Sequence, residues 1–372
     1  MRSTGIRGVY VSIEGGTLVV RSKKPLRTLS SAILNGGLAN AYSIVNHQVP
    51  TNYTCNDSES YLKRALELKR NVKFPVIGLM TAAKIRNFAL TRMSSSRLTV
   101  ATIVTVGLSY PATAGDKTSV AADHAGTINI ILLIDGNPTD ACMVNIVETA
   151  TEAKAAALHD LDIRSRFSRE ASTGTTTDAV IVASTRRGRA VEYAGSATTL
   201  GYLVARTVRT GIEQAAAKVE GISRQRSMVH RLQERGITLD ALVKAGMELF
   251  IGAKSTSFQN TRALLREELR KSLADINVAA LMLAAVRLEE DAKRGLIPEL
   301  SSEAFRQDPV ILVADECIGS QIANYLAGTW GTYNFLRYDR FKPGIISKLG
   351  PFMDDAVAGL VGGTLAKIML KR

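Results

Sequence analysis

The sequence predicts a chain of two domains, an N-terminal α/β domain with a mixed sheet and helices and a C-terminal all-α helical domain. Three observations support this prediction. The 372 residues exceed what one compact core usually holds. Strand-like and helix-like segments alternate up to about residue 219, and strand signals nearly vanish beyond residue 235. The polar, basic stretch 220–235 is typical of a linker, so we place the domains at residues 1–221 and 222–372.

The first expected elements are two strands, residues 6–13 and 17–21, which are rich in β-branched side chains. Glu14, Gly15 and Gly16 separate them, and such a sequence indicates a hairpin. The apolar run at residues 126–135, GTINIILLID, predicts a further strand, and the alanine-, glutamate- and lysine-rich segment after it predicts a helix. Further strands are expected at residues 76–83, 98–108 and 179–183, and helices at residues 58–70, 145–163 and 195–219.

The C-terminal domain is expected to consist of helices because its apolar residues recur with helical spacing. Thr238 or Asp240 can cap the first helix and Asn277 the third, since their side-chain oxygens accept hydrogen bonds from helix N-termini. The expected helices cover residues 238–251, 258–273, 278–294, 309–326 and 354–370.

Composition excludes several classes of protein. The formal charge is +13, but the basic residues are scattered, aromatic residues are only 5%, and no nucleic-acid-binding signature is found. The three cysteines are far apart, which argues against a disulfide framework or a zinc site. The apolar stretches 278–286 and 356–365 are too short or too glycine-rich to span a bilayer. We therefore expect a cytoplasmic protein with no membrane span, and a homo-oligomer is compatible with the sequence.

A hydroxyl-rich segment, residues 172–177, follows the predicted helix at residues 145–163. Its serine and threonine residues surround Gly174, a composition that suits neither a helix nor a buried strand. Closely spaced hydroxyl and N–H groups can hold polar substrate atoms or a developing oxyanion. The alternative is an ordinary surface turn.

Acidic residues of the C-terminal domain form a second candidate site. Asp354 and Asp355 lie within an otherwise apolar stretch, where two carboxylates are costly to bury unless they are paired or bind a metal ion. The alternative is a solvated helix start. Asp315 and Glu316 form another acidic pair, and the cationic residues of segment 334–344 can neutralise a phosphate group near such a metal ion.

The N-terminal domain resembles the adenosylcobinamide amidohydrolase family of archaeal cobamide salvage. The segments that carry the resemblance are LSSAILNGG (29–37), GLMTAA (78–83), VTVGLSYPATAGD (104–116), GTINI (126–130), TATEAKAAAL (149–158), TGTTTDAV (173–180) and YAGSATTLG (193–201). The resemblance implies hydrolysis of the amide that joins a corrin side chain to aminopropanol. We assign the chemistry to Thr173, Thr175 or Thr177 with Asp178 or Glu152, and His124 is a weaker candidate for a general base. Polar contacts to the corrinoid substrate are expected from Asn35, Thr81 and Asn129, each of which can instead satisfy buried backbone groups.

The C-terminal domain resembles the phosphatidylglycerophosphatase A superfamily. The segments concerned are RGITLDALVKAG (235–246), LEEDAKRGLIP (288–298), VADECIG (313–319), NFLRYDRFKPGIISKLG (334–350) and FMDDAVAGLVGG (352–363). The archaeal branch includes an α-ribazole-5′-phosphate phosphatase, so the resemblance implies a helical, Mg²⁺-dependent phosphatase. It implies metal ligands at Asp315, Glu316, Asp354 and Asp355, and phosphate contacts at Asn334, Arg337 and Lys342.

Together the two resemblances predict a bifunctional cobamide-salvage hydrolase. One domain would release aminopropanol from adenosylcobinamide, with no cofactor evident from its sequence, and the other would remove phosphate from α-ribazole 5′-phosphate with Mg²⁺. Three alternatives stay open. The N-terminal domain can be a non-catalytic corrinoid-binding module, the phosphatase can act on adenosylcobalamin 5′-phosphate, or it can act on phosphatidylglycerophosphate.

Overall fold

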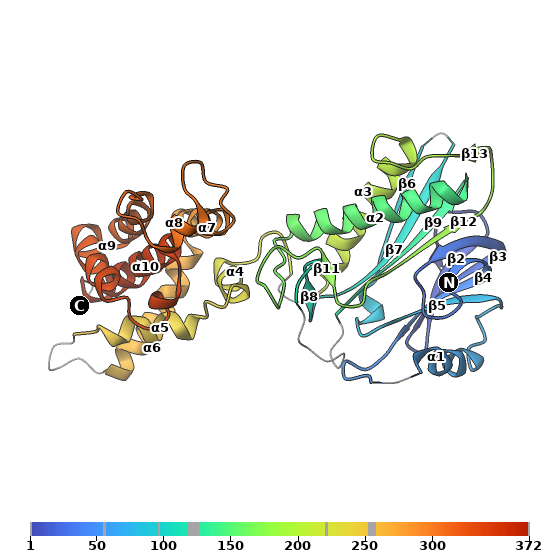
Figure 1. Cartoon of the computed structure of the whole chain (residues 1–372). Helices are drawn as coiled ribbons and strands as arrows, with labels where there is room; N and C mark the ends of the chain where they lie inside the picture. The colour runs from blue at the N-terminus through green and yellow to red at the C-terminus, as the bar shows by residue number, and fades with distance from the viewer. Residues whose placement is uncertain are drawn as a thin grey trace. The chain divides into compact units, whose positions relative to one another are not determined.

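The structure, a computed structural model, describes residues 2–54, 57–95, 97–117, 126–219, 222–251 and 258–370. The chain forms two compact units, residues 1–224 and residues 225–372. The first contains a mixed sheet with helices and the second is helical, as the sequence predicts (Figure 1). The candidate general base His124 lies outside the described residues.

The N-terminal unit is built on one curled sheet with the strand order β1-β2-β3-β12-β9-β7-β6, to which β4 and β5 add beside β3. Two strand pairs, β12 with β9 and β4 with β5, are parallel, and the others are antiparallel. The strands are β1 (Arg2–Ser3), β2 (Val9–Glu14), β3 (Thr17–Ser30), β4 (Gly37–Gln48), β5 (Val76–Thr81), β6 (Ala89–Ser94), β7 (Thr99–Gly107), β9 (Thr127–Asp135) and β12 (Ala179–Ser184).

Strand β3 allows the sheet to curl. Gly15 and Gly16, both with positive φ, form the predicted hairpin between β2 and β3. The β3 strand then continues far beyond the predicted end at residue 21, with a register shift between Arg21 and Leu26. A bulge of this kind bends a strand, and β3 pairs with β2 in its first half and with β12 in its second half.

Both faces of strand β9 are buried, as its uninterrupted apolar sequence predicts. On one face, Ile130 and its neighbours pack under α2 (Asp140–Asp160) and α3 (Thr199–Ala217), which lie along the sheet in Figure 1. On the other face, Ile131 packs inside the curled sheet. Helix α1 (Ser58–Glu67) covers β3, β4 and β5 with Leu62 and Leu66. The remaining short elements are η1 (Ile85–Asn87), β8 (Pro111–Ala112), β10 (Asn137–Pro138), β11 (Gly174–Thr175) and β13 (Ala190–Val191).

The C-terminal unit packs its helices around α10, which is apolar on every side and almost wholly buried. The elements are α4 (Met228–Glu234), α5 (Leu239–Glu248), α6 (Phe258–Ala274), α7 (Ile276–Lys293), α8 (Ser302–Arg306), α9 (Ala314–Phe341), η2 (Ile346–Lys348) and α10 (Pro351–Leu370). Helix α9 is interrupted by non-helical backbone at Ala327 and Gly328 and continues to Phe341, beyond the expected helix end at residue 326.

Two helix caps test the sequence predictions. Thr238 caps α5, with its hydroxyl accepting a hydrogen bond from Ala241 N at 3.2 Å. The expected cap Asn277 is wrong, because Asp275 caps α7 and accepts from the backbone N of Asn277 and Val278. Within the described parts of the chain, the helices are all too short or too polar to cross a bilayer.

Candidate functional site

Asp178 directly follows the hydroxyl-rich segment, residues 172–177, and anchors the loop that this segment forms. Its carboxylate accepts hydrogen bonds from Ile128 N at 2.9 Å, from Thr175 N at 3.0 Å and from the Thr175 hydroxyl, and it forms an ion pair with Lys154. A carboxylate offers about four acceptor positions, so the described contacts occupy all of them. Asp178 therefore fixes the loop against β9 and α2.

Lys154 was not among the residues assigned from the sequence. It lies on the sheet-facing side of α2, and only 9% of the residue is exposed. Glu152, the residue that we assigned, lies two positions earlier on the exposed side of the same helix. The fold thus brings Lys154 to Asp178 and leaves Glu152 facing away from the sheet.

The loop hydroxyls make backbone contacts. Thr175 Oγ1 lies 2.7 Å from the carbonyl oxygen of Gly126, and Thr173 Oγ1 accepts a hydrogen bond from Ala114 N at 2.9 Å. Strand β11 pairs with β8 at this point. Neither Thr173 nor Thr175 lines a described pocket, whereas Thr177 does.

A pocket of about 270 Å³ lies beside this loop. The Thr177 hydroxyl donates to Gly126 O at 2.9 Å and lies 2.7 Å from the Thr127 hydroxyl. Because the single Thr177 proton goes to Gly126, Thr127 is the donor of that pair, and both oxygens keep acceptor capacity. The polar residues of the wall are Ser31, Thr51, Tyr53, Ser58, Thr81, Thr127, Asn129, Thr177 and Asp178.

Asn129 is the most deeply buried polar residue of this wall, at 1% exposure. Its side-chain nitrogen donates to Asn46 Oδ1 at 3.0 Å and to the carbonyl oxygen of Met80 at 2.9 Å. Its Oδ1 atom has no hydrogen-bond partner among the described residues. An unpaired buried carbonyl is costly, and Asn129 lines the pocket, so its side-chain oxygen is an acceptor for which the described residues supply no donor.

The other two expected substrate contacts are placed differently. Thr81 lines the pocket, and its hydroxyl accepts a hydrogen bond from Ala83 N at 3.0 Å. Asn35 adopts a positive φ and its side chain donates to Val76 O at 2.8 Å. Asn35 is not part of the pocket wall, and its contact holds the turn before β4 against β5.

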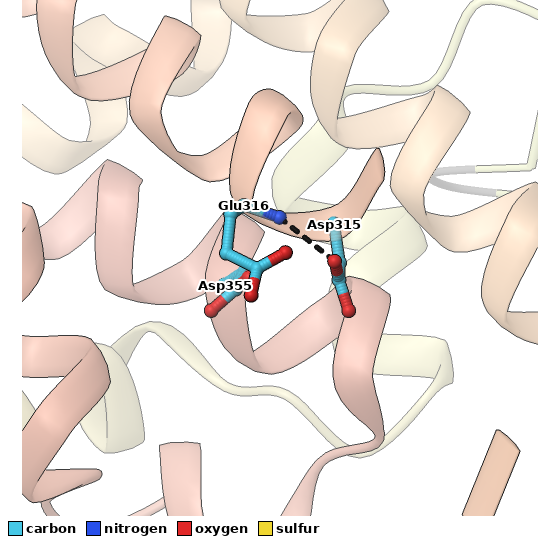
Figure 2. Close-up of side chains that lie close together, drawn as sticks. All are labelled: Asp315, Glu316 and Asp355. Atoms are coloured by element: carbon cyan, nitrogen blue, oxygen red, sulfur yellow. Dashed lines mark hydrogen bonds between the residues drawn. The ribbon is translucent and has the colours of Figure 1, made fainter. Parts of the chain in front are cut away.

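In the C-terminal unit, three of the four predicted metal ligands come together. Figure 2 shows Asp315 and Glu316 in the first turn of α9 with Asp355 of α10 beside them. One oxygen from each of these carboxylates lies within 4.8 Å of the others. Asp315 and Asp355 are buried and Glu316 is exposed, and Asp315 Oδ1 accepts a hydrogen bond from Glu316 N at 3.0 Å.

The pKa values in this cluster are raised. Burial raises the pKa of Asp355, and the hydrogen bond that its protonated carboxyl group donates to Asp339, together with the charge of Asp339, raises it further. Burial likewise raises the pKa of Asp315, and Glu316 adds to the effect. A divalent cation would displace these shared protons and neutralise the clustered charge. The donor set of closely spaced, hard carboxylate oxygens fits Mg²⁺.

Asp354, the fourth predicted ligand, forms an ion pair with Lys342. Lys342 Nζ lies 2.6 Å from Asp354 Oδ2, and it also reaches Asp308 at 3.4 Å. Burial raises the pKa of Asp354 to about 7 although the nearby Lys342 lowers it. Asp354 Oδ1 has no hydrogen-bond partner among the described residues. The pair therefore has unused hydrogen-bonding capacity next to the carboxylate cluster.

A second pocket, of about 560 Å³, includes Asp354 in its wall. Its cations, Lys293, Arg306 and Lys348, were not assigned from the sequence. They come from three separate elements and share no sequence motif, so only the folded chain reveals that they converge. The wall of this pocket thus combines three cations, of which Lys293 forms an ion pair with Glu289, with two acids, Asp308 and Asp354.

Asn334 and Arg337 do not lie in this pocket. The Asn334 side chain donates to Gly362 O at 2.8 Å, and Arg337 donates to Asn334 Oδ1 at 3.1 Å and to Leu249 O at 3.2 Å. Both residues line a largely apolar pocket with Trp330 and Tyr333. Of the three expected phosphate contacts, the structure places only Lys342 beside a predicted metal ligand, Asp354.

Comparisons with known proteins agree with this division. A family model described as adenosylcobinamide amidohydrolase matches residues 4–224, and a model described as phosphatidylglycerophosphatase A matches residues 235–370. An adenosylcobinamide amidohydrolase of Methanosarcina mazei is 30% identical over 189 residues, which cover 48% of this chain and 85% of that protein. An uncharacterized protein of Methanocaldococcus jannaschii is 38% identical over 128 residues, which cover 33% of this chain and 97% of that protein.

Among solved structures, the low temperature requirement C protein from Listeria monocytogenes matches 38% of this chain and 92% of its own chain, with 20% identity and a TM-score of 0.34. Both family models describe hydrolases, and the chain is a hydrolase. Because the first model spans more than half of the sequence, the chain belongs to the adenosylcobinamide amidohydrolase family, and its second unit is phosphatidylglycerophosphatase A-like.

Proposed function

We propose that the chain catalyses two hydrolytic steps of cobamide salvage. The N-terminal unit cleaves the aminopropanol amide of adenosylcobinamide and gives adenosylcobyric acid. The C-terminal unit removes phosphate from α-ribazole 5′-phosphate in a Mg²⁺-dependent reaction. The second assignment rests on the three carboxylates of Asp315, Glu316 and Asp355, which lie within 4.8 Å of one another. It also rests on the pocket beside Asp354, whose wall contains three cations.

In the amide reaction, water adds to the amide carbonyl, the C–N bond breaks, and a carboxylic acid and an amine leave. We assign to Asn129 Oδ1 the hydrogen bond from the substrate N–H, because this atom is buried and unpartnered. The Thr127 and Thr177 oxygens accept hydrogen bonds from the attacking water, which orients it. Asp178 and Lys154 hold the loop that carries Thr177, and Lys154 forms an ion pair with Asp178 of this wall.

In the phosphatase reaction, Asp315, Glu316 and Asp355 would hold the cation. When bound, the ion polarises the phosphate and lowers the pKa of water. Lys342 and the cations of the adjoining pocket bind the phosphate oxygens, which carry the negative charge of the ester. Asp354 keeps Lys342 in position. We favour α-ribazole 5′-phosphate because the neighbouring unit belongs to a corrinoid-cleaving family.

Purified full-length protein should be incubated with adenosylcobinamide and, separately, with α-ribazole 5′-phosphate, each with and without Mg²⁺. We expect aminopropanol from the first substrate under both conditions and phosphate from the second only with Mg²⁺. Adenosylcobalamin 5′-phosphate and phosphatidylglycerophosphate serve as competing phosphatase substrates. Tight corrinoid binding without aminopropanol release would assign the first unit a binding role instead.

A further inference from the structure

The N-terminal unit contains a larger pocket, of about 780 Å³, that adjoins the amide pocket. The two pockets share Thr51 and Ala82 in their walls. The larger pocket is formed by η1 after strand β5, by the loop after β7 and by the C-terminal end of α3. The two pockets are therefore neighbours, and a ligand of the amide pocket lies close to the larger one.

The charge of this larger pocket is positive. Lys84, Arg86, Arg166 and Lys218 line it, and none of the described lining residues carries a carboxylate. Such a set of like charges raises the local concentration of anions. The amide pocket next to it contains Asp178 but no cation among its lining residues, so the two pockets differ in the groups that they accept.

The four cations fall into two pairs. The Arg166 guanidinium stacks over the Tyr110 ring at 4.5 Å and donates to Ser109 O at 3.2 Å, and Lys218 Nζ donates to Phe88 O. These contacts fix two cations in the wall. Lys84 and Arg86 are exposed, and within the described chain their side chains make no hydrogen bond or ion pair, although the Lys84 carbonyl oxygen accepts from Asn87 N. They are the donors that remain for a ligand.

The chemistry of these donors selects a phosphate ester. Guanidinium and ammonium groups bind phosphate through charge-assisted hydrogen bonds. Corrinoid amide side chains are neutral. A phosphate on the hydroxyl of the amino alcohol is therefore the anionic group that would lie nearest to the cleaved amide bond. The pocket is large enough for that phosphate and for further atoms attached to it.

We propose that this pocket, defined by Lys84, Arg86, Arg166 and Lys218, binds the phosphate of a corrinoid whose amino alcohol is phosphorylated. The inference rests on the proposed amidohydrolase function and extends its substrate class. The reaction is the same: water adds to the amide carbonyl, the C–N bond breaks, and the phosphorylated amino alcohol leaves as the amine. The phosphate adds binding energy away from the reacting bond, so it lowers KM.

The test compares adenosylcobinamide with adenosylcobinamide phosphate. Full-length protein with Asp355→Asn is used, so that the phosphate ester is not removed during the assay. We expect a KM about tenfold lower for the phosphorylated substrate, corresponding to one charge-assisted contact of moderate strength. In Lys84→Ala/Arg86→Ala this preference should disappear while KM for adenosylcobinamide is kept. The matched control is Lys24→Ala/Arg97→Ala, which removes one exposed lysine and one exposed arginine outside both pockets.

Equal KM values for the two corrinoids, or a preference that survives in Lys84→Ala/Arg86→Ala, would overturn the inference while leaving the amidohydrolase function intact. If the protein cleaved neither corrinoid, the proposed amidohydrolase function itself would be wrong. Inorganic phosphate and α-ribazole 5′-phosphate are added as inhibitors of adenosylcobinamide cleavage. Inhibition by either of them as strong as that by the phosphorylated corrinoid would assign the pocket to a free phosphate compound and reject the corrinoid assignment.

Discussion

A Cβ atom on Gly359 would lie 2.1 Å from the carbonyl oxygen of Gly319, so helices α9 and α10 touch backbone to backbone at these two glycines. Asp315 precedes Gly319 by four residues, and Asp355 precedes Gly359 by four residues. Residues four apart lie on the same face of a helix. The glycine contact therefore determines how closely the carboxylates of the candidate metal site approach one another.

The first prediction concerns this contact. In Gly359→Ala the added methyl group must push the helices apart, because no flexible side chain can give way. We expect a loss of about 1–3 kcal/mol in the free energy of unfolding. Displaced ligands should weaken Mg²⁺ binding by about 10-fold or more. Urea unfolding and calorimetric Mg²⁺ titration measure the two effects. The comparison variant is Asp355→Asn, which removes a candidate ligand without adding volume. Unchanged Mg²⁺ affinity in Gly359→Ala would show that the glycine contact does not set the spacing of the carboxylates.

The second prediction concerns the ion pair between Lys342 and Asp354. Lys342→Met leaves Asp354, 5% exposed, without its described cationic partner. An unsatisfied buried polar group costs about 1–3 kcal/mol, and we expect a loss of this size in urea unfolding. In the double variant Lys342→Met/Asp354→Asn the loss should be smaller, because no buried charge is left unpaired. Equal losses in the single and double variants would show that the pair does not stabilise the unit.

The third prediction separates the two activities. Asp355→Asn removes a candidate cation ligand, and phosphate release should fall about 100-fold or more while aminopropanol release is unchanged. Asp178→Asn weakens the contacts that hold the Thr177 loop, and the opposite pattern is expected. Both activities are measured on the same full-length preparations. If one substitution abolished both in a folded protein, the assignment of one reaction to each unit would be wrong.

The fourth prediction concerns Asn129. In Asn129→Ala the substrate loses its proposed acceptor, and KM for adenosylcobinamide should rise roughly tenfold, as expected for one lost hydrogen bond. Asn46→Ala is the matched control, because it disrupts the same buried network and leaves Asn129 Oδ1 in place. We expect Asn46→Ala to lose stability but to keep KM. A similar rise in KM in both variants would indicate that the network only supports the fold.

The sequence predicts strands well where burial is purely apolar, as in β9, and fails where buried residues are polar. Strand β4 was missed because Asn46 and His47 interrupt its apolar pattern. Both side chains are buried and form hydrogen bonds there. Asn46 pairs with Thr105 and Asn129, and His47 pairs with Thr17. The hydrogen-bond partners of these side chains lie far away along the chain, so they cannot be predicted from the residues next to Asn46 and His47.

The candidate sites show the same limit. Acid pairs such as Asp354 and Asp355 stand out because carboxylates are costly in apolar sequence. The cations of the 560 Å³ pocket in the C-terminal unit do not stand out in the sequence, and neither does Asp339. Each is an ordinary charged residue until the helices pack together. Lys154 could have been found, because it lies one helical turn after Ala150 on the buried side of α2, whereas Glu152 does not.

The last prediction is a pH dependence of the N-terminal unit's stability that arises from His47. Burial lowers the pKa of His47 below its ordinary value of 6.5, and the charge of Lys69 lowers it further. In the unfolded chain, His47 takes up a proton at its ordinary pKa, whereas in the folded chain it resists protonation. Acidification therefore favours the unfolded state, so this contribution to stability is complete above pH 6.5 and is lost as the pH falls below that value.

The free energy of unfolding should thus decrease between about pH 7.5 and pH 5.5, and His47→Gln should reduce that decrease. Hydrogen exchange of β4 amides reports on this unit specifically. The exposed His159 provides the control, because His159→Gln removes a histidine from the same unit without changing its core. If His47→Gln kept the wild-type pH dependence, the neutral, buried imidazole would not be its source, and other titrating groups of the unit would have to account for it.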